Sequence, residues 1–297
     1  MATADSPGYN NVGFIGLGDM GGPMAKNLVA NCSSELTQLR VFDIQLRQEQ
    51  VPASAIVCES LTEIAANSDI AFVSVPDGDS SIDVVNKLLE QPNSRLRCLI
   101  NLSTVGLSAS QQISDLIPSG SFTYIDAPVS GGKTGAINAT ITVMWSGSRH
   151  YFDELHPLLS TFAKSVFFVG DKAGQGQALK LLNNYLSGVA LTATSEAVRF
   201  GLHHGLDLKT LLDVVHVSTG QNTAVSDKFP KRILTQSYDA GFRMALMQKD
   251  ISLYQDGVTA AGLPDGILGE VAQYWEQGLE QYPDGDFTEI FKLIDID

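Results

Sequence analysis

Basic residues are scarce in this chain of 297 residues, which has 19 Lys and Arg against 33 Asp and Glu and a formal net charge of −14. A surface this acidic repels the phosphates of nucleic acids and the headgroups of anionic lipids. We therefore expect neither nucleic acid nor membrane as a partner, and we interpret the acidity as a feature that favours solubility. An anionic small molecule would need a local positive site.

Cysteine is rare as well, and long apolar runs are missing. Cys32, Cys58 and Cys98 lie far apart without CxxC or metal-ligand spacing, so we expect reduced thiols and no metal. No apolar run approaches the length of a membrane-spanning helix. The first ten residues contain no Lys or Arg, which argues against a secretory signal and a mitochondrial transit peptide. The expected location is the cytoplasm, with the mitochondrion as the alternative if a transit peptide has been removed.

The chain has enough apolar material for a core, 44% of its residues, and its length suits two domains better than one. Short apolar runs alternate with helical patterns in the first half. This alternation predicts an α/β fold with a doubly wound, mostly parallel sheet that helices cover on both faces. The expected strands are 12–16, 39–43, 55–58, 70–75, 98–103, 122–126, 140–145 and 165–169. The expected helices between them are 20–30, 61–66, 80–89, 108–116 and 151–162.

After residue 170 the strand signals end and long helical patterns follow. The expected helices are 177–204, 208–217, 242–261, 266–280 and 287–294. A helix as long as the first of these usually bridges two domains or forms the spine of one. We therefore predict a first domain over residues 1–172 and an all-helical second domain over residues 173–297.

A glycine pattern of the G-x-G-x-x-G type stands at Gly16, Gly18 and Gly21, between the first expected strand and the first expected helix. In that context the pattern predicts a dinucleotide site. The three glycines permit, in order, a tight turn, close approach of a pyrophosphate to the backbone, and close packing of helix on strand. The helix N-terminus then offers N–H groups to the phosphates. The alternative is a glycine-rich surface turn.

Asp43 stands 25 positions after Gly18, at the end of the next expected strand. A carboxylate there accepts hydrogen bonds from both adenine-ribose hydroxyls and repels a 2′-phosphate, which predicts NAD rather than NADP. Arg47 is close enough to weaken this preference, although we favour its interpretation as a solvated arginine. The alternative for Asp43 is an unrelated loop aspartate.

Two later strand ends should line the same crevice, because ligands bind at the carboxyl ends of parallel strands. Val75 and Pro76 end one strand, and Thr104 follows another. Thr104 is suited to hydrogen-bond the nicotinamide ribose, and capping of the following helix is an equal alternative.

Three further segments carry residues suited to a small anion and its chemistry. In residues 130–132 a serine precedes two glycines, which leave backbone N–H groups unobstructed and able to hold a carboxylate, although a plain turn is the alternative.

Lys180 and Asn184 are four positions apart and share one helix face. Burial lowers the pKa of a lysine and makes its amine a proton acceptor near neutrality, whereas most lysines are solvated. Lys249, beside Asp250, could reach a cofactor or substrate, or form an ordinary surface pair.

Taken in chain order, these segments resemble the β-hydroxyacid dehydrogenase family and, within it, the 3-hydroxyisobutyrate dehydrogenases. The matching segments are GFIGLGDMGGPMAKNL at 13–28, DAPVSGG at 126–132, GQGQALKLLNN at 174–184, and KD at 249–250. The resemblance implies a Rossmann-type NAD-binding domain, then an all-helical domain for substrate binding and oligomerisation. It also implies assembly as a homodimer or homotetramer.

The resemblance makes Lys180 the catalytic lysine and Asn184 its neighbour in the active site. It places the substrate carboxylate on Ser130, Gly131 and Gly132. It places the cofactor on Gly16, Leu17, Gly18, Asp19, Met20, Val75, Pro76, Thr104 and Lys249. The implied reaction is reversible oxidation of a hydroxyl carbon beta to a carboxylate, without a metal. Lys180 takes the hydroxyl proton and NAD the hydride.

Three departures from the family pattern bear on the substrate. The family often has Asp where Asn101 stands, Gly-Thr-Leu at 139–141 where this chain has Ala-Thr-Ile, and smaller residues where Trp145 stands. The candidate substrates are 3-hydroxyisobutyrate, 3-hydroxypropionate, and glycerate- or threonate-type acids. Two alternatives stay open: an imine or carbonyl reductase of the same fold, whose members usually lack the lysine, and a non-catalytic dinucleotide-binding module.

Overall fold

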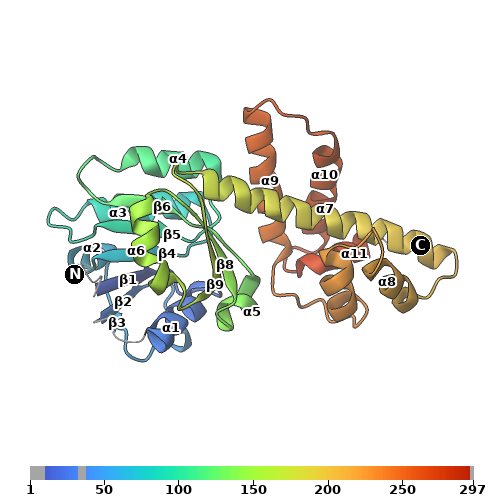
Figure 1. The fold of residues 1–297 in the computed structure, drawn as a ribbon, viewed down its shortest axis with the longest axis horizontal. Coiled ribbons are helices and arrows are strands. Elements are labelled where there is room, and N and C mark those ends of the chain that lie inside the picture. Colours follow the sequence, from blue (N-terminus) through green and yellow to red (C-terminus); the bar gives the residue numbers. More distant parts are fainter. Residues whose placement is uncertain (1–10, 33–37, 295–297) are drawn as a thin grey trace, which may run out of the picture. The chain divides into compact units, whose positions relative to one another are not determined.

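The computed structural model describes residues 11–32 and 38–294 and divides into two compact units, Met1–Lys180 and Leu181–Asp297 (Figure 1). The division falls inside helix α7 (Gln175–His203), whereas the boundary predicted from the sequence precedes that helix. The first ten residues, which carry the argument about targeting segments, lie outside the described residues. No helix in the described part of the chain has the length and apolar character that a membrane crossing needs.

The first unit is built on one sheet with the strand order β3-β2-β1-β4-β5-β6-β8-β7, and β9 pairs with β8. Strands β1 to β6 pair in parallel, whereas β8 runs antiparallel to β6 and β7 and parallel to β9. The prediction of a mostly parallel sheet is confirmed. The strands are β1 (Asn11–Ile15), β2 (Gln38–Phe42), β3 (Ile56–Val57), β4 (Ile70–Val73), β5 (Cys98–Asn101), β6 (Thr123–Asp126), β7 (Val129–Ser130), β8 (Ile141–Ser146) and β9 (Ala163–Gly170).

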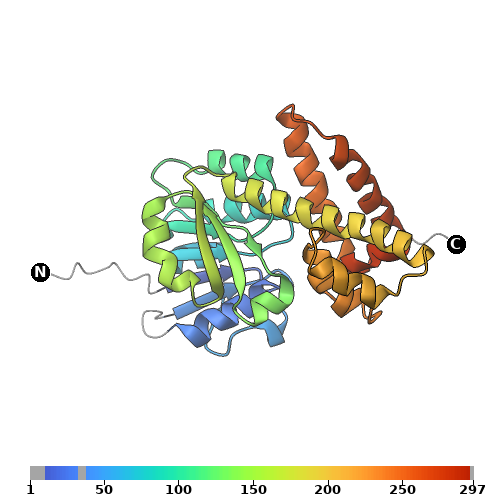
Figure 2. The same cartoon turned by 45° about the vertical axis from the view of Figure 1, so that its right-hand side comes forward.

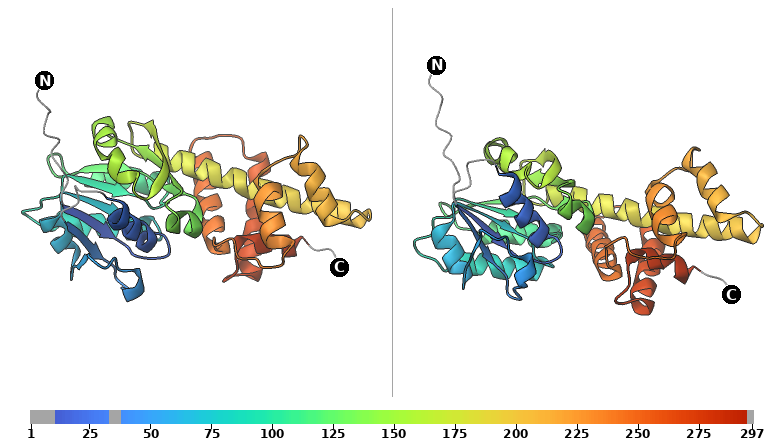
Figure 3. Two further views of the ribbon diagram at one scale, coloured as in Figure 1. Left: turned by 60° about the horizontal axis from the view of Figure 1, so that its bottom comes forward. Right: turned by 90° about the horizontal axis from the view of Figure 1, so that it is seen from below.

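Helices cover both faces of this sheet, as Figure 3 shows. Successive side chains of a strand point to opposite faces, so Phe14 joins one core and Ile15 the other. The first core takes side chains from α1 and α6, and the second from α2, α3 and α4. The helices are α1 (Gly21–Asn31), α2 (Leu61–Asn67), α3 (Gly78–Leu89), α4 (Leu107–Leu116), α5 (Gly132–Ile137) and α6 (Arg149–Leu159), with a short 3-10 turn at Gln48–Gln50.

The second unit is helical in its described part, as predicted, apart from one isolated bridge between Arg243 and Asp286. Its core surrounds the fully buried Trp275, and α9 and α10 lie side by side (Figure 2). After the end of α7 its helices are α8 (Leu208–His216), the π-helix η2 (Ala224–Ile233), α9 (Met244–Ala260), α10 (Gly266–Gln281), the 3-10 turn η3 (Phe287–Glu289) and α11 (Ile290–Leu293).

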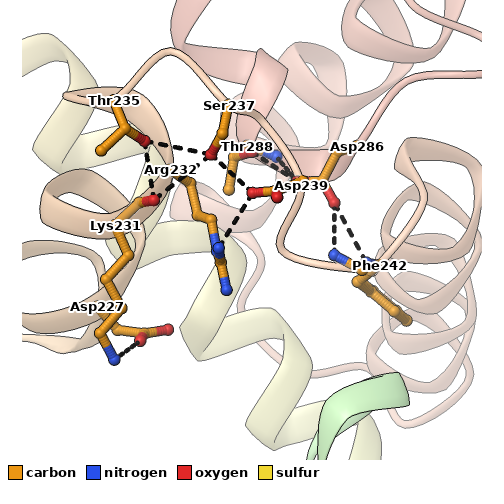
Figure 4. A network of polar contacts seen from close by, with 10 residues as sticks. Asp227, Lys231, Arg232, Thr235, Ser237, Asp239, Phe242, Asp286 and Thr288 are labelled. Carbon is orange, nitrogen blue, oxygen red and sulfur yellow. Dashed lines mark hydrogen bonds and ion pairs between the residues drawn. The ribbon is translucent and has the colours of Figure 1, made fainter.

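Polar contacts fix the connection from η2 to α9 (Figure 4). Asp239 accepts hydrogen bonds from Ser237 Oγ at 2.6 Å and from Arg232 Nη1 at 3.1 Å. Asp286 Oδ2 accepts from the backbone N–H of Phe242 at 3.2 Å. Because α9 begins two residues later, these contacts set the start of the helix that carries Lys249.

Candidate active site

The glycine pattern forms the tight turn between β1 and α1. Gly16 has a φ of +88°, and a Cβ there would lie 2.1 Å from the backbone oxygen of Ser74. A Cβ at Gly21 would lie 1.9 Å from the oxygen of Gly16, whereas one at Gly18 would meet nothing within 4 Å. The packing of the chain itself therefore requires two of the glycines. The third, Gly18, leaves the space beside the backbone open, as the glycine pattern predicts.

Asp43 follows β2 and lies beside this turn. Its Oδ2 accepts a hydrogen bond from the backbone N–H of Leu17 at 2.5 Å, and its Oδ1 accepts one from that of Gln45 at 2.7 Å. Arg47 is half-exposed and pairs with Asp19, at 3.5 Å from Nη2 to Oδ1. The carboxylate of Asp43 therefore lies at the glycine turn, and the guanidinium of Arg47 pairs with Asp19 rather than with Asp43.

The ends of β4 and β5 lie at the same edge of the sheet. Ser74 N–H donates to Ile15 O at 2.8 Å, and Val75 N–H donates to Ser103 Oγ at 2.9 Å. The N-cap of α4 is Gly106, so the alternative that Thr104 caps this helix is wrong. The glycine turn and the Asp43, Val75–Pro76 and Thr104 segments are therefore brought together.

The segment predicted to hold a carboxylate forms β7 and the start of α5. Gly131 and Gly132 have φ values of +128° and +62°, and a Cβ at Gly132 would meet nothing within 4 Å. The next residue, Lys133, places its Nζ 3.3 Å from Asp19 Oδ1. This ion pair brings the Ser130–Gly132 segment beside the glycine turn and adds a cation there.

Asp126, at the end of β6, is fully buried and anchors the start of α7. Its Oδ2 accepts hydrogen bonds from Gln177 N–H at 3.1 Å and from Ser146 Oγ at 3.2 Å. The same serine oxygen accepts from Gly176 N–H at 2.9 Å. Burial raises the pKa of Asp126 to about 6, although these hydrogen bonds lower it. The first turn of α7 is therefore fastened to β6 and β8.

Lys180 and Asn184 follow on α7 and are both buried, with exposed fractions of 7% and 6%. The alternative of a solvated lysine is therefore wrong. Asn184 Nδ2 donates to Asp250 Oδ2 at 2.6 Å, and Lys249 Nζ lies 3.2 Å from Asp250 Oδ1. Because Asp250 is only 3% exposed, the alternative of an ordinary surface pair is also wrong. The structure joins the predicted Asn184 and Lys249 through a carboxylate.

Sequence reasoning assigned no function to Asp126, Gln177 or Asp250. The one signal available in the sequence concerned Asp126, a carboxylate at the end of an apolar strand, where an unpaired charge would be costly.

Two of the departures from the family pattern have structural roles. Trp145 is fully buried and packs on Phe152. Asn101 is buried and donates to Ser81 Oγ at 3.2 Å.

A parallel sheet with a glycine turn after β1, an acidic residue after β2 and a helical second unit is typical of dinucleotide-dependent oxidoreductases. Residues 11–170 match the family described as the NAD binding domain of 6-phosphogluconate dehydrogenase. Residues 174–294 match the family described as NAD-binding of NADP-dependent 3-hydroxyisobutyrate dehydrogenase.

Individual relatives are similar to this chain along most of its length. The mitochondrial 3-hydroxyisobutyrate dehydrogenase of Rattus norvegicus is 32% identical over 297 residues, covering 95% of this chain and 86% of the relative. The 2-(hydroxymethyl)glutarate dehydrogenase of Eubacterium barkeri is 31% identical over 277 residues, covering 90% and 88%. The solved structure of Mycobacterium tuberculosis 3-hydroxyisobutyrate dehydrogenase with L-serine has a TM-score of 0.88 and 28% identity, covering 97% and 99%.

The chain therefore belongs to the 3-hydroxyisobutyrate dehydrogenase group of the β-hydroxyacid dehydrogenase family. It is an NAD(P)-dependent oxidoreductase of that family, whose substrates are small hydroxyacids. The family resemblance, the fold class and the enzymatic nature predicted from the sequence are confirmed. Because these relatives include a mitochondrial and a bacterial protein, the cytoplasmic location stays a prediction.

Proposed function

We propose that this chain oxidises a small β-hydroxyacid of the 3-hydroxyisobutyrate type with NAD, and that Lys180 accepts the hydroxyl proton. The observation that carries the proposal is the burial of Lys180 on a helix whose first turn is fastened to β6, to β8 and to the loop after β5, which carries Thr104. The neutral amine can take the hydroxyl proton, and the ammonium that results can then stabilise negative charge on the substrate oxygen.

The small molecules in the names of the relatives support this substrate class. 3-Hydroxyisobutyrate, 2-(hydroxymethyl)glutarate and L-serine each carry a hydroxymethyl group on the carbon next to a carboxylate. In this chain Ser130, Gly131 and Gly132 would hold that carboxylate through backbone N–H groups and the serine hydroxyl. Lys133, which pairs with Asp19, adds positive charge to a protein that is otherwise acidic.

The proposed cofactor site comprises the turn from Gly16 to Met20, with Val75, Pro76, Thr104 and Lys249. When bound, the nicotinamide ring supplies the hydride acceptor. Asp43 is expected to favour NAD, since its carboxylate at the glycine turn would repel a 2′-phosphate. The open space at Gly18, where a Cβ would meet nothing within 4 Å, supports the approach of a pyrophosphate to the backbone.

In this proposal Lys180 transfers the proton and Asn184 orients the reacting groups. Lys180 takes the proton as the hydroxyl is oxidised and returns it in the reverse direction. Asn184 is held by Asp250 and orients the lysine or the substrate hydroxyl. We further propose a homodimer or homotetramer, which the exposed apolar side chains of Leu182, Leu186 and Phe200 along α7 support.

A hydroxyacid panel tests the proposal. The enzyme is mixed with NAD or NADP and one acid, and the absorbance of the reduced nicotinamide is followed. We expect the highest kcat/KM with 3-hydroxyisobutyrate or a related hydroxymethyl acid, and a preference for NAD of at least about tenfold, equal to about 1.4 kcal/mol.

Lactate is the matched control, because its hydroxyl stands on the carbon next to the carboxylate. Oxidation of lactate without oxidation of any β-hydroxyacid would contradict the substrate class. A clear preference for NADP would contradict the role of Asp43. Reduction of a cyclic imine in place of hydroxyacid oxidation would favour the imine reductase alternative.

A further inference from the structure

Gln177 is a completely buried polar side chain in the first turn of α7, and all of its hydrogen-bonding capacity is used. Its Nε2 donates to Asp126 Oδ1 at 2.5 Å and to Ser103 O at 3.0 Å. Its Oε1 accepts from the backbone N–H groups of Val105 at 2.9 Å and Gly106 at 3.2 Å. A primary amide has two donor hydrogens and two acceptor lone pairs. A carboxylate or thioether of similar size cannot make these four contacts.

The four contacts join two parts of the proposed active site. Thr104, the residue proposed to contact the cofactor, stands between Ser103 and Val105, which both bond to Gln177. Lys180 follows Gln177 by three positions, less than one turn of the helix. A side chain that fixes the first turn of α7 to the loop after β5 therefore fixes the origin of the lysine side chain relative to that loop.

The carboxylate of Asp126, at the end of β6, is the acidic group that contacts Gln177. Asp126 holds both the side chain and the backbone N–H of Gln177, at 2.5 and 3.1 Å. Gly176 adds close packing, since a Cβ there would lie 2.6 Å from the backbone oxygen of Met144. The first turn of α7 thus has little freedom to rotate or slide.

We propose that Gln177 is a positioning residue, which holds Lys180 at a fixed distance from the Thr104 segment through its bonds to Asp126 and the loop after β5. The proposal rests on the proposed function, in which Lys180 accepts the substrate proton. Proton transfer depends steeply on geometry, and a misplacement of ~1 Å can lower the rate about a hundredfold.

Gln177→Glu is the sharpest single variant, because it keeps the shape and replaces the donating Nε2 by an oxygen. That oxygen faces the carboxylate of Asp126 and the carbonyl of Ser103. We expect kcat to fall about a hundredfold, with KM and the Kd for NAD, from protein fluorescence, within about tenfold of the wild-type values. Gln175→Glu is the matched control: Gln175 is exposed and uses only its Oε1, which accepts from Lys172 N–H at 2.9 Å. It should keep wild-type kcat.

A reciprocal double variant separates positioning from simple damage. In Asp126→Asn combined with Gln177→Glu, the amide and the carboxylate exchange places, so the bond between the two side chains returns with reversed polarity. We expect kcat to recover about tenfold relative to Gln177→Glu, though not fully, because the carbonyl of Ser103 still faces an oxygen.

Chemical labelling gives a readout that does not depend on turnover. Acetic anhydride labelling of Lys180, measured by mass spectrometry, should be faster in Gln177→Glu than in the wild type and should slow again in the double variant. Lys164, an exposed lysine on β9, is the internal reference and should label equally in all three proteins.

The outcomes separate this proposal from the proposed function. Wild-type kcat in Gln177→Glu overturns the positioning role and leaves the function intact if Lys180→Ala is inactive. Lost kcat without faster labelling of Lys180 and without recovery in the double variant also overturns it. Failure of both variants to fold shows a purely structural role and overturns it as well. Wild-type turnover in Lys180→Ala instead removes the proposed function.

Discussion

Asp126 shows how a single residue can carry a cost that the surrounding hydrogen bonds only partly offset. Burial raises the pKa of its carboxyl group from 3.8 to about 6. Between these values the folded protein holds a proton that the unfolded chain has released. The free energy of unfolding therefore falls as the pH rises through this window, by about 3 kcal/mol over its full width.

This linkage predicts a pH-dependent difference between the wild type and Asp126→Asn. From about pH 5 to about pH 8 the wild type should lose about 1 kcal/mol of stability relative to the variant, whose amide does not titrate. Urea unfolding of both proteins at the two pH values measures the difference, and other titrating groups cancel between them. An equal difference at both pH values would contradict the raised pKa of Asp126.

At the residue scale, the spacing of the sequence identified residues that the structure brings together, while their roles in binding stay predictions. Gly16, Gly18 and Asp43 were assigned from spacing, and the structure places them together at one turn. Gln177 and Asp250 carried no such signal, because an amide and a carboxylate within helices are normally solvated. Their burial depends on neighbours that come from distant parts of the chain.

In the turn between β1 and α1, alanine substitutions at two glycines are expected to have opposite effects, one on stability and the other on NAD binding. Gly21→Ala brings a Cβ to 1.9 Å from the backbone oxygen of Gly16, so α1 must move away from β1. We expect a loss of stability of about 1–3 kcal/mol. Gly18→Ala meets nothing within 4 Å and should fold like the wild type, yet its methyl group occupies the proposed pyrophosphate space.

Thermal unfolding and NAD titration of the two variants test this reading of the turn. Gly18→Ala should keep the Tm of the wild type and weaken NAD binding at least about tenfold, equal to 1.4 kcal/mol. Gly21→Ala should lower the Tm. Unchanged NAD affinity in a folded Gly18→Ala protein would show that the pyrophosphate does not approach the backbone there.

At the element scale, long periodic segments were predicted with ends shifted by a few residues, as for α7, expected at 177–204 and found at Gln175–His203. The elements β7, α5 and η2 were not predicted. β7 has only two residues, and α5 begins at two glycines with positive φ. The π-helix η2 contains Pro230, which is unusual inside a helix. Tertiary packing, rather than local pattern, creates these elements.

For the whole molecule, the order of elements predicted the architecture, because an alternating β–α series followed by helices leaves few ways to bury both apolar faces. The sequence predicted a boundary at residues 172–173, and the structure divides the chain at Lys180 and Leu181, within α7. Nothing in a continuous helical pattern marks such a division. The polar chain from Asn184 through Asp250 to Lys249 likewise required the fold of the second unit.

The central claim is that the buried amine of Lys180 performs the proton transfer while other residues bind the cofactor. Lys180→Ala tests it most directly, with Lys172→Ala, which removes an exposed lysine just before α7, as the matched control. Turnover of the best hydroxyacid and the Kd for NAD are measured for both. We expect Lys180→Ala to bind NAD like the wild type and to lose about a thousandfold in kcat, with the control unchanged. Wild-type turnover in Lys180→Ala would contradict the account.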